Sequence, residues 1–252
     1  MRETLEALEA GEVTVAEAEA QLAGYVTTDE GRYDAAREQR HGVPEAILAE
    51  GKRPDEVVSL ARTALETTER AIVTRVKEET LEALKDDFPE SARFDHDNRA
   101  RTVVVKSTEF TAPEVKAVVG IATAGTSDAN IGGEAATIAR EMGAAVEFIE
   151  DIGVANLDRL LDRVEDLQET DVLVVAAGRE GALPTVIAGL INSPVIGLPV
   201  STGYGAGGDG RSALHSMLQS CTVLSIVNID AGFVAGAQAG LIARAISRAR
   251  QE

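Results

Sequence analysis

Apolar and polar positions alternate regularly over the C-terminal part of the chain. Short, nearly continuous apolar runs predict five strands, at residues 115–122, 145–149, 171–177, 194–198 and 222–227. Apolar residues at helical spacing predict five helices, at about 129–142, 156–168, 183–191, 211–219 and 232–249. Strands that alternate with helices in this way predict a parallel sheet covered on both faces. We therefore expect a doubly wound α/β domain.

The first hundred residues have a less regular pattern and predict a smaller α/β domain. The expected order is two short helices within 1–24, an irregular stretch at 25–51, a helix at 53–68, a strand at 71–76, a helix at about 78–87, an exposed polar turn at 88–101 and a strand at 103–105. Residues 107–113 have the composition of a linker. This pattern predicts an accessory domain at 1–106 and the doubly wound domain at 115–252.

The charge of the chain is its most unusual bulk property. The 252 residues carry a formal net charge of −18, spread along the whole length, and 44% of them are hydrophobic, as in ordinary soluble enzymes. An even acidic coat indicates a protein adapted to high cytoplasmic salt, where screening weakens the self-repulsion. The same charge argues against nucleic acid or an anionic membrane as a partner, because both require basic patches.

The sequence also predicts the cellular location of the protein and limits its disulfide and metal chemistry. No run of eighteen or more apolar residues is present, and the charged helical start does not resemble a signal peptide, so a cytoplasmic protein is expected. One cysteine cannot form an intramolecular disulfide, and with three dispersed histidines it excludes the usual Cys/His zinc spacings. Any metal would need oxygen ligands.

Loops rich in small and polar residues follow every predicted C-terminal strand except the second. Because parallel strands end at the same edge of a sheet, these loops are expected to converge there on one ligand site. Glycines, hydroxyls and a helix N-terminus suit a phosphorylated small molecule. The candidate binding residues are Ala124, Gly125, Thr126, Ser127, Gly178, Gly181, Ser201, Gly203, Tyr204, Gly205, Asn228 and Asp230.

Three residues are candidates for the chemistry itself. Asp128 and Glu180 could act as acid or base, because a carboxylate beside a desolvated ligand can have its pKa raised toward neutrality. Asp128 could equally be a helix cap. Cys221 could be a small buried hydrophobe, and since it follows a helix that runs back from the site, it should lie at the far edge of the sheet. A catalytic Cys221 would need a neighbouring subunit.

Several motifs closely resemble the LarB family over nearly the whole chain. They are residues 123–128, 178–184, 194–206, 220–233 and, near the N-terminus, 37–52. The resemblance implies a synthase of pyridinium-3,5-biscarboxylic acid mononucleotide, acting first in assembly of the nickel-pincer nucleotide cofactor. It also implies a PurE-like, flavodoxin-like C-terminal domain similar to aminoimidazole ribonucleotide carboxylase, and a homo-octamer whose sites are shared between subunits. Arg179 departs from the apolar residue expected at its position.

The reaction implied by the resemblance is carboxylation of nicotinic acid adenine dinucleotide at pyridinium C5 by carbon dioxide, with hydrolysis of its phosphoanhydride to release AMP. Cys221 would be the nucleophile and Glu180 or Asp128 the proton acceptor. Asn228 and Asp230 would contact ribose or an assisting Mg²⁺, and no organic cofactor is implied.

Two other functions fit parts of the sequence. A purine-pathway carboxylase or mutase acting on an aminoimidazole ribonucleotide would share the C-terminal architecture, but it would need neither the N-terminal hundred residues nor a cysteine nucleophile. A non-catalytic nucleotide-binding module would explain the anion-binding loops and leave Glu180 and Cys221 without a role.

Overall fold

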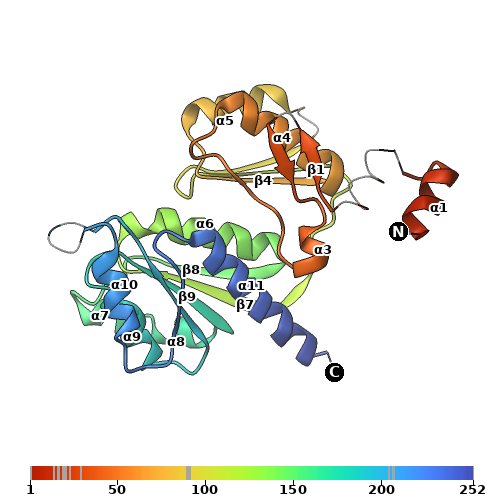
Figure 1. Cartoon of the computed structure of the whole chain (residues 1–252). Coiled ribbons are helices and arrows are strands. Elements are labelled where there is room, and N and C mark those ends of the chain that lie inside the picture. The colour runs from red at the N-terminus through yellow and green to blue at the C-terminus, as the bar shows by residue number, and fades with distance from the viewer. Residues whose placement is uncertain are drawn as a thin grey trace. The chain divides into compact units, whose positions relative to one another are not determined.

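The computed structural model describes residues 2–13, 15, 18, 22, 24–28, 30–88, 92–203, 205 and 208–251. The chain divides into two compact units, Met1–Thr111 and Ala112–Glu252, each with its own core (Figure 1). Among the described residues, no helix combines the length and hydropathy needed to cross a bilayer.

The N-terminal unit is a four-stranded mixed sheet with helices packed on it. Its elements are α1 (Arg2–Ala10), β1 (Val26–Thr28), β2 (Gly31–Tyr33), α3 (Arg37–His41), β3 (Ile47–Leu48), α4 (Pro54–Thr68), β4 (Arg70–Thr74), α5 (Glu78–Asp87), β5 (Arg93–Asp97) and β6 (Thr102–Lys106). The sheet order is β3-β4-β6-β5, with β3 parallel to β4 and the other pairs antiparallel. A fully buried β4 packs against the apolar face of α4.

Two predictions for this unit were wrong. The stretch at 25–51 contains the hairpin β1–β2, helix α3 and strand β3, whose short lengths leave no periodic signal. The polar segment expected as a turn contains β5, an edge strand that pairs only with β6. Most of its side chains are exposed, so its sequence lacks the apolar alternation of a half-buried strand. The predicted second helix near the N-terminus falls mostly outside the described residues.

The C-terminal unit is the doubly wound α/β domain that the pattern predicts. Its elements are β7 (Val115–Thr123), the 3₁₀ turn η1 (Thr126–Asp128), α6 (Ala129–Glu141), β8 (Ala144–Ile149), α7 (Leu157–Leu161), α8 (Val164–Gln168), β9 (Val172–Ala177), α9 (Ala182–Ala188), β10 (Val195–Pro199), α10 (Arg211–Leu218), β11 (Ser225–Ile226) and α11 (Gly232–Ala249). The five-stranded sheet has the order β11-β10-β9-β7-β8, and every pair is parallel.

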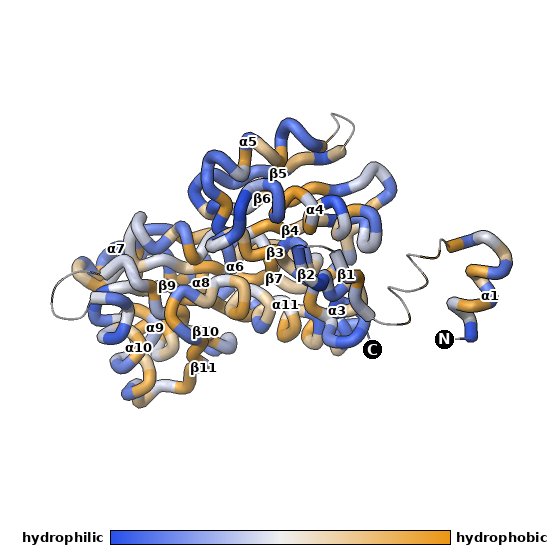
Figure 2. Tube along the Cα trace, turned by 45° about the horizontal axis from the view of Figure 1, so that its top comes forward, coloured by the Kyte–Doolittle hydropathy of each residue, from blue (hydrophilic) through white to orange (hydrophobic). Residues whose placement is uncertain are grey.

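Helices cover both faces of this sheet, which explains why its central strands β9 and β10 are apolar throughout (Figure 2). Helices α6 and α11 pack on one face, and α7 to α10 pack on the other. The helix predicted at 156–168 is broken into α7 and α8, and the last strand is shorter than predicted because only Ser225 and Ile226 pair with β10. The strand order reverses between β7 and β9, where a ligand crevice is expected in such sheets.

Candidate functional site

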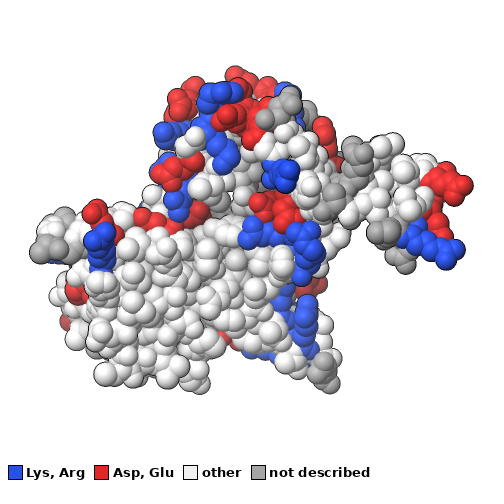
Figure 3. All heavy atoms as spheres, viewed as in Figure 1, with Lys and Arg blue, Asp and Glu red and all other residues white. Residues whose placement is uncertain are grey.

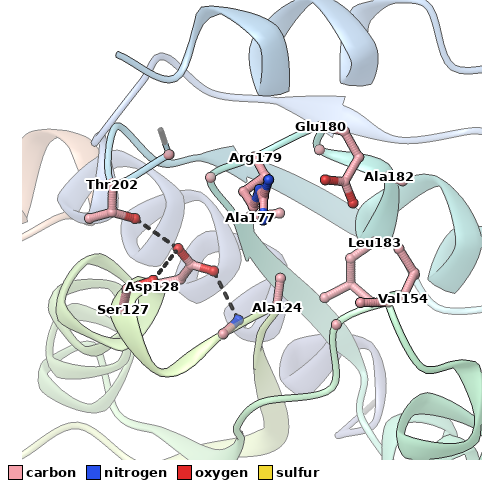
Figure 4. Close-up of a pocket in the computed structure, with 16 residues that line it drawn as sticks. Ala124, Ser127, Asp128, Val154, Ala177, Arg179, Glu180, Ala182, Leu183 and Thr202 are labelled. Carbon is pink, nitrogen blue, oxygen red and sulfur yellow. Dashed lines mark hydrogen bonds between the residues drawn. The ribbon is translucent and has the colours of Figure 1, made fainter. Parts of the chain in front are cut away.

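A cavity of about 410 Å³ opens at the carboxyl edge of the C-terminal sheet (Figure 4). It is lined by loops that follow four strands, β7, β8, β9 and β10, together with the first residues of α9. The lining residues are Ala124, Gly125, Ser127, Asp128, Gly153, Val154, Ala155, Ala177, Gly178, Arg179, Glu180, Gly181, Ala182, Leu183, Thr202 and Gly203. The predicted convergence of loops on one ligand-sized space therefore exists in the structure.

Glycines hold these loops in direct backbone contact. A Cβ on Gly203 would lie 2.2 Å from the carbonyl oxygen of Gly178, and one on Gly153 would lie 2.5 Å from the carbonyl oxygen of Ala124. Any side chain at either position would push two loops apart, because a backbone carbonyl cannot rotate away. The glycines therefore fix the shape of the cavity wall.

Asp128 is the buried acidic group of the cavity, with its side chain held from two directions. Its Oδ2 accepts the backbone N–H of Gly125 at 2.9 Å, and its Oδ1 accepts the hydroxyl of Thr202 at 2.9 Å and that of Ser127 at 3.4 Å (Figure 4). Only 4% of the residue is exposed. Burial raises the pKa of Asp128 above its usual range, and the bonds from Thr202, Gly125 and Ser127 partly oppose that rise.

The contacts of Asp128 bear on both roles that the sequence left open. Its bond to Gly125 closes the 3₁₀ turn that precedes α6. The same carboxyl lines the cavity, and burial raises its pKa.

The cavity has a polar side and an apolar side. Asp128, Ser127 and Thr202 form the polar side, whereas Leu183 and Val154 line the other (Figure 4). Glu180 and Arg179 lie on the loop after β9, and both are exposed. This arrangement suits a ligand with a flat apolar ring and hydroxyl or anionic groups.

The structure brings most, but not all, of the predicted site residues to this cavity. Asp128, Glu180, Ala124, Gly125, Ser127, Gly178, Gly181 and Gly203 line it. Thr126, Ser201, Gly205, Asn228, Asp230 and Cys221 are not among its lining residues. Tyr204 lies outside the described residues.

Asp230 and Asn228 lie in the loop after β11, and their side chains accept hydrogen bonds from the backbone. Asp230 has a left-handed backbone with φ of 55°, and its Oδ1 accepts the N–H of Ser201 at 2.9 Å. The Asn228 side chain accepts the N–H of Ile229. Within the part of the chain that the structure describes, no group of three or more His, Cys, Asp or Glu side chains could hold a metal ion. Asp230 therefore belongs to no such group among the described residues.

Cys221 is exposed and lies in the turn between α10 and β11. The neighbouring Thr222 hydroxyl donates to the carbonyl oxygen of Thr185 on α9, at 3.4 Å. Because this turn precedes a parallel strand, it lies at the edge of the sheet opposite the cavity. Cys221 is therefore neither a buried hydrophobe nor part of the cavity.

Two parts of the cavity wall were missed from the sequence. Gly153, Val154 and Ala155 come from the loop after β8, the one strand whose following loop was not expected to contribute. Thr202 lies beside predicted residues in the glycine-rich loop, but nothing local marks its hydroxyl as the partner of Asp128. The small residues at 153–155 were the available signal for the loop after β8. The role of Thr202 depends on a contact with a residue 74 positions away in the sequence.

Comparisons with known proteins match both units. A family model described as AIR carboxylase matches residues 118–252, and one described as a LarB/PurE-like N-terminal domain matches residues 25–108. An uncharacterized protein of Methanocaldococcus jannaschii is 37% identical over 256 residues, covering 97% of each chain.

More distant similarities concern the C-terminal unit's family. The N5-carboxyaminoimidazole ribonucleotide mutase of the same organism is 32% identical over 129 residues, which cover 50% of this chain and 76% of the mutase. The crystal structure of Treponema denticola PurE matches 53% of this chain and 94% of its own, with 13% identity and a TM-score of 0.38.

Proposed function

The chain belongs to the LarB family, with an AIR carboxylase domain as its C-terminal part, and on that premise we propose which carboxylation it catalyses. The substrate is nicotinic acid adenine dinucleotide, which gains a carboxylate at pyridinium C5 from carbon dioxide. Hydrolysis of the phosphoanhydride then gives pyridinium-3,5-biscarboxylic acid mononucleotide and AMP.

The observation that carries the proposal is a buried carboxyl facing an apolar wall within one cavity. Leu183 and Val154 offer apolar surface to the face of a pyridinium ring, while Asp128 has the raised pKa of a group that takes up a proton. Carboxylation at C5 replaces a ring proton, so a base in this position is required by the chemistry.

A thiolate explains how an electron-poor ring can react with carbon dioxide. Addition of the Cys221 thiolate beside C5 forms a C–S bond and makes C5 nucleophilic, as in an enamine. C5 then attacks carbon dioxide and forms the new C–C bond. Removal of the C5 proton returns that electron pair to the ring as the C–S bond breaks, which releases the thiolate and restores the pyridinium.

This mechanism needs Cys221 from a neighbouring subunit, and we propose a homo-octamer with shared sites. Exposed apolar side chains flank the cysteine, since Leu218 is 60% exposed and Val223 is 94% exposed. The visible face of the C-terminal unit over α9 and α10 is largely uncharged, although the chain carries a net charge of −18 (Figure 3). An uncharged surface with exposed apolar side chains suits contact with another copy of the chain.

The phosphoanhydride cleavage is assigned to no residue of the cavity. Mg²⁺, where it assists, enters on the phosphates of the substrate in this proposal, because the described residues offer it no ligand cluster.

The direct test incubates the protein with nicotinic acid adenine dinucleotide, bicarbonate and Mg²⁺ in high salt and analyses the products by mass spectrometry. We expect AMP and a mononucleotide with one added carboxylate. Cys221→Ser should keep the fold and abolish carboxylation. Sustained carboxylation by Cys221→Ser would remove the covalent step from the proposal.

Mixing two inactive variants tests the shared site. Cys221→Ser and Asp128→Asn each remove one half of the chemistry, so mixed oligomers should recover part of the activity through sites that combine two intact halves. Equal inactivity of the mixture and of each variant, after subunit exchange is verified by native mass spectrometry, would place both residues in one subunit's site or in none.

The second candidate is a carboxylase or mutase for an aminoimidazole ribonucleotide. It is favoured by the 32% identity to the N5-carboxyaminoimidazole ribonucleotide mutase. Turnover of that ribonucleotide without turnover of nicotinic acid adenine dinucleotide would select it. Binding of both nucleotides without turnover of either would indicate a nucleotide-binding module.

A further inference from the structure

The two oxygens of Asp128 have different kinds of partner. Oδ2 accepts the backbone N–H of Gly125, which can only donate a hydrogen bond. Oδ1 faces the hydroxyl of Thr202 at 2.9 Å and that of Ser127 at 3.4 Å, and hydroxyls can both donate and accept. The hydroxyl of Thr202 can therefore either donate to Oδ1 or accept a proton from it, whereas the N–H of Gly125 can only donate to Oδ2.

The Thr202 side chain lies between the cavity and the buried Oδ1 of Asp128. Asp128 is 4% exposed, whereas Thr202 is exposed and lines the same cavity. Gly178 borders the hydrogen bond between the two side chains, because a Cβ there would lie 3.0 Å from Thr202 Oγ1 and 3.1 Å from Asp128 Oδ1. Gly178 thus leaves just enough room for the hydrogen bond between the two side chains.

We propose that Thr202 is a proton relay, whose hydroxyl passes a proton between the bound substrate and Oδ1 of Asp128. The inference rests on the proposed carboxylation and assigns one of its steps. As the C5–H bond breaks, Thr202 Oγ1 accepts that proton and gives its own hydroxyl proton to Asp128 Oδ1. The C–H electron pair stays in the ring, so Thr202 ends neutral and Asp128 ends as a neutral acid.

Charged side chains also lie on the loop after β9 and on α6, the helix that follows Asp128. Arg179 and Glu180 lie on the exposed loop after β9. On α6, Glu134 is buried, and its Oε2 lies 2.6 Å from where a Cβ on Gly232 would be, at the start of α11. The causes of the raised pKa of Asp128 are burial first, opposed by the hydrogen bonds from Thr202, Gly125 and Ser127. Loss of the Thr202 hydroxyl should therefore raise this pKa further.

The test compares Thr202→Val, which keeps the shape and removes the hydroxyl, with Thr202→Ser, which keeps the hydroxyl. Thr170→Val is the matched control, because it removes a buried hydroxyl that donates to the Leu167 carbonyl oxygen at 2.8 Å, at the opposite edge of the same sheet. Carboxylation is measured as kcat and KM against pH, together with the solvent isotope effect. The carboxyl of Asp128 is titrated by ¹³C NMR in each protein.

For Thr202→Val we expect kcat to fall about 100-fold or more, the range of a lost acid–base contribution, with KM changed by less than about threefold. Thr202→Ser should recover most of kcat, and Thr170→Val should match the wild type. The pH profile of the residual activity and the Asp128 titration should both move to higher pH. A solvent isotope effect, which reports the exchangeable proton that passes from Thr202 to Asp128, should appear only when residue 202 carries a hydroxyl.

Two results would overturn the relay. Unchanged kcat and pH profile in Thr202→Val, with an active wild type, would remove Thr202 from the proton path. If the wild type itself fails to carboxylate the dinucleotide, the carboxylation proposal fails, and the titration still decides the hydrogen-bond basis of the relay. An Asp128 pKa that is equal in Thr202→Val and wild type would reject the hydrogen bond on which the relay depends.

Discussion

Gly203→Ala tests whether the backbone contact between two loops shapes the cavity. The new Cβ would lie 2.2 Å from the carbonyl oxygen of Gly178 and 3.1 Å from its carbon. Ordinary C···O contacts are about 3.3 Å or longer, so the loops after β9 and β10 must separate by about 1 Å. No rotamer can relieve the contact, because both the Cβ and the carbonyl are fixed to the backbone.

Two measurable effects follow from that separation. Overpacking of this kind destabilises by about 1–3 kcal/mol, which lowers the unfolding temperature of a domain of this size by about 2–12 °C. The displacement also separates Thr202 from Asp128, which are joined at 2.9 Å. A shift of about 1 Å in a catalytic arrangement can reduce kcat about 100-fold.

Gly208→Ala is the matched stability control in the same loop. Its new Cβ would have an ordinary contact of 3.5 Å with the Gly205 oxygen. Calorimetry in high salt should show little change or a gain of about 0.4–1 kcal/mol for this variant, because alanine restricts the unfolded chain. Equal melting temperatures and equal kcat for Gly203→Ala and wild type would refute the claim that this contact shapes the site.

Three further predictions concern stability. Asp128→Asn should abolish carboxylation yet unfold at a higher urea concentration than wild type at about pH 8. The pKa of Asp128 is raised by burial, so its stabilising contribution is complete below the unfolded value of about 3.9 and is lost as the pH rises through the folded value. The difference between the two proteins should shrink toward pH 4, and a constant difference would contradict this sign. Gly236→Ala places a Cβ 2.3 Å from the Ala135 carbonyl oxygen, so α11 must move off α6 and the free energy of unfolding should fall by about 1–3 kcal/mol. An unchanged urea midpoint would contradict this prediction. The wild type, with its charge of −18, should gain stability between dilute buffer and about 2 M KCl, and a flat urea midpoint across that range would exclude adaptation to salt.

The apolar pattern of the chain is enough to predict the architecture of the C-terminal unit. Strands buried on both faces must be apolar, so β9, β10 and most of β7 were visible as apolar runs. Parallel pairing then places the loops that follow them at one edge, which predicted a site containing Asp128, Gly178 and Gly203. The prediction was weakest where segments are short or polar, as at the edge strand β5 and the hairpin β1–β2.

The environment of each predicted residue depends on the folded chain. The burial of Asp128, and hence its raised pKa, depends on loops that are distant in sequence, and so does its bond to Thr202. The contact of Val154 with the cavity depends on the packing of the loop after β8, where only the small residues at 153–155 gave a signal. Local pattern fixes which edge of a sheet a residue reaches, whereas solvation and hydrogen bonding are set by neighbours that only the folded chain brings together.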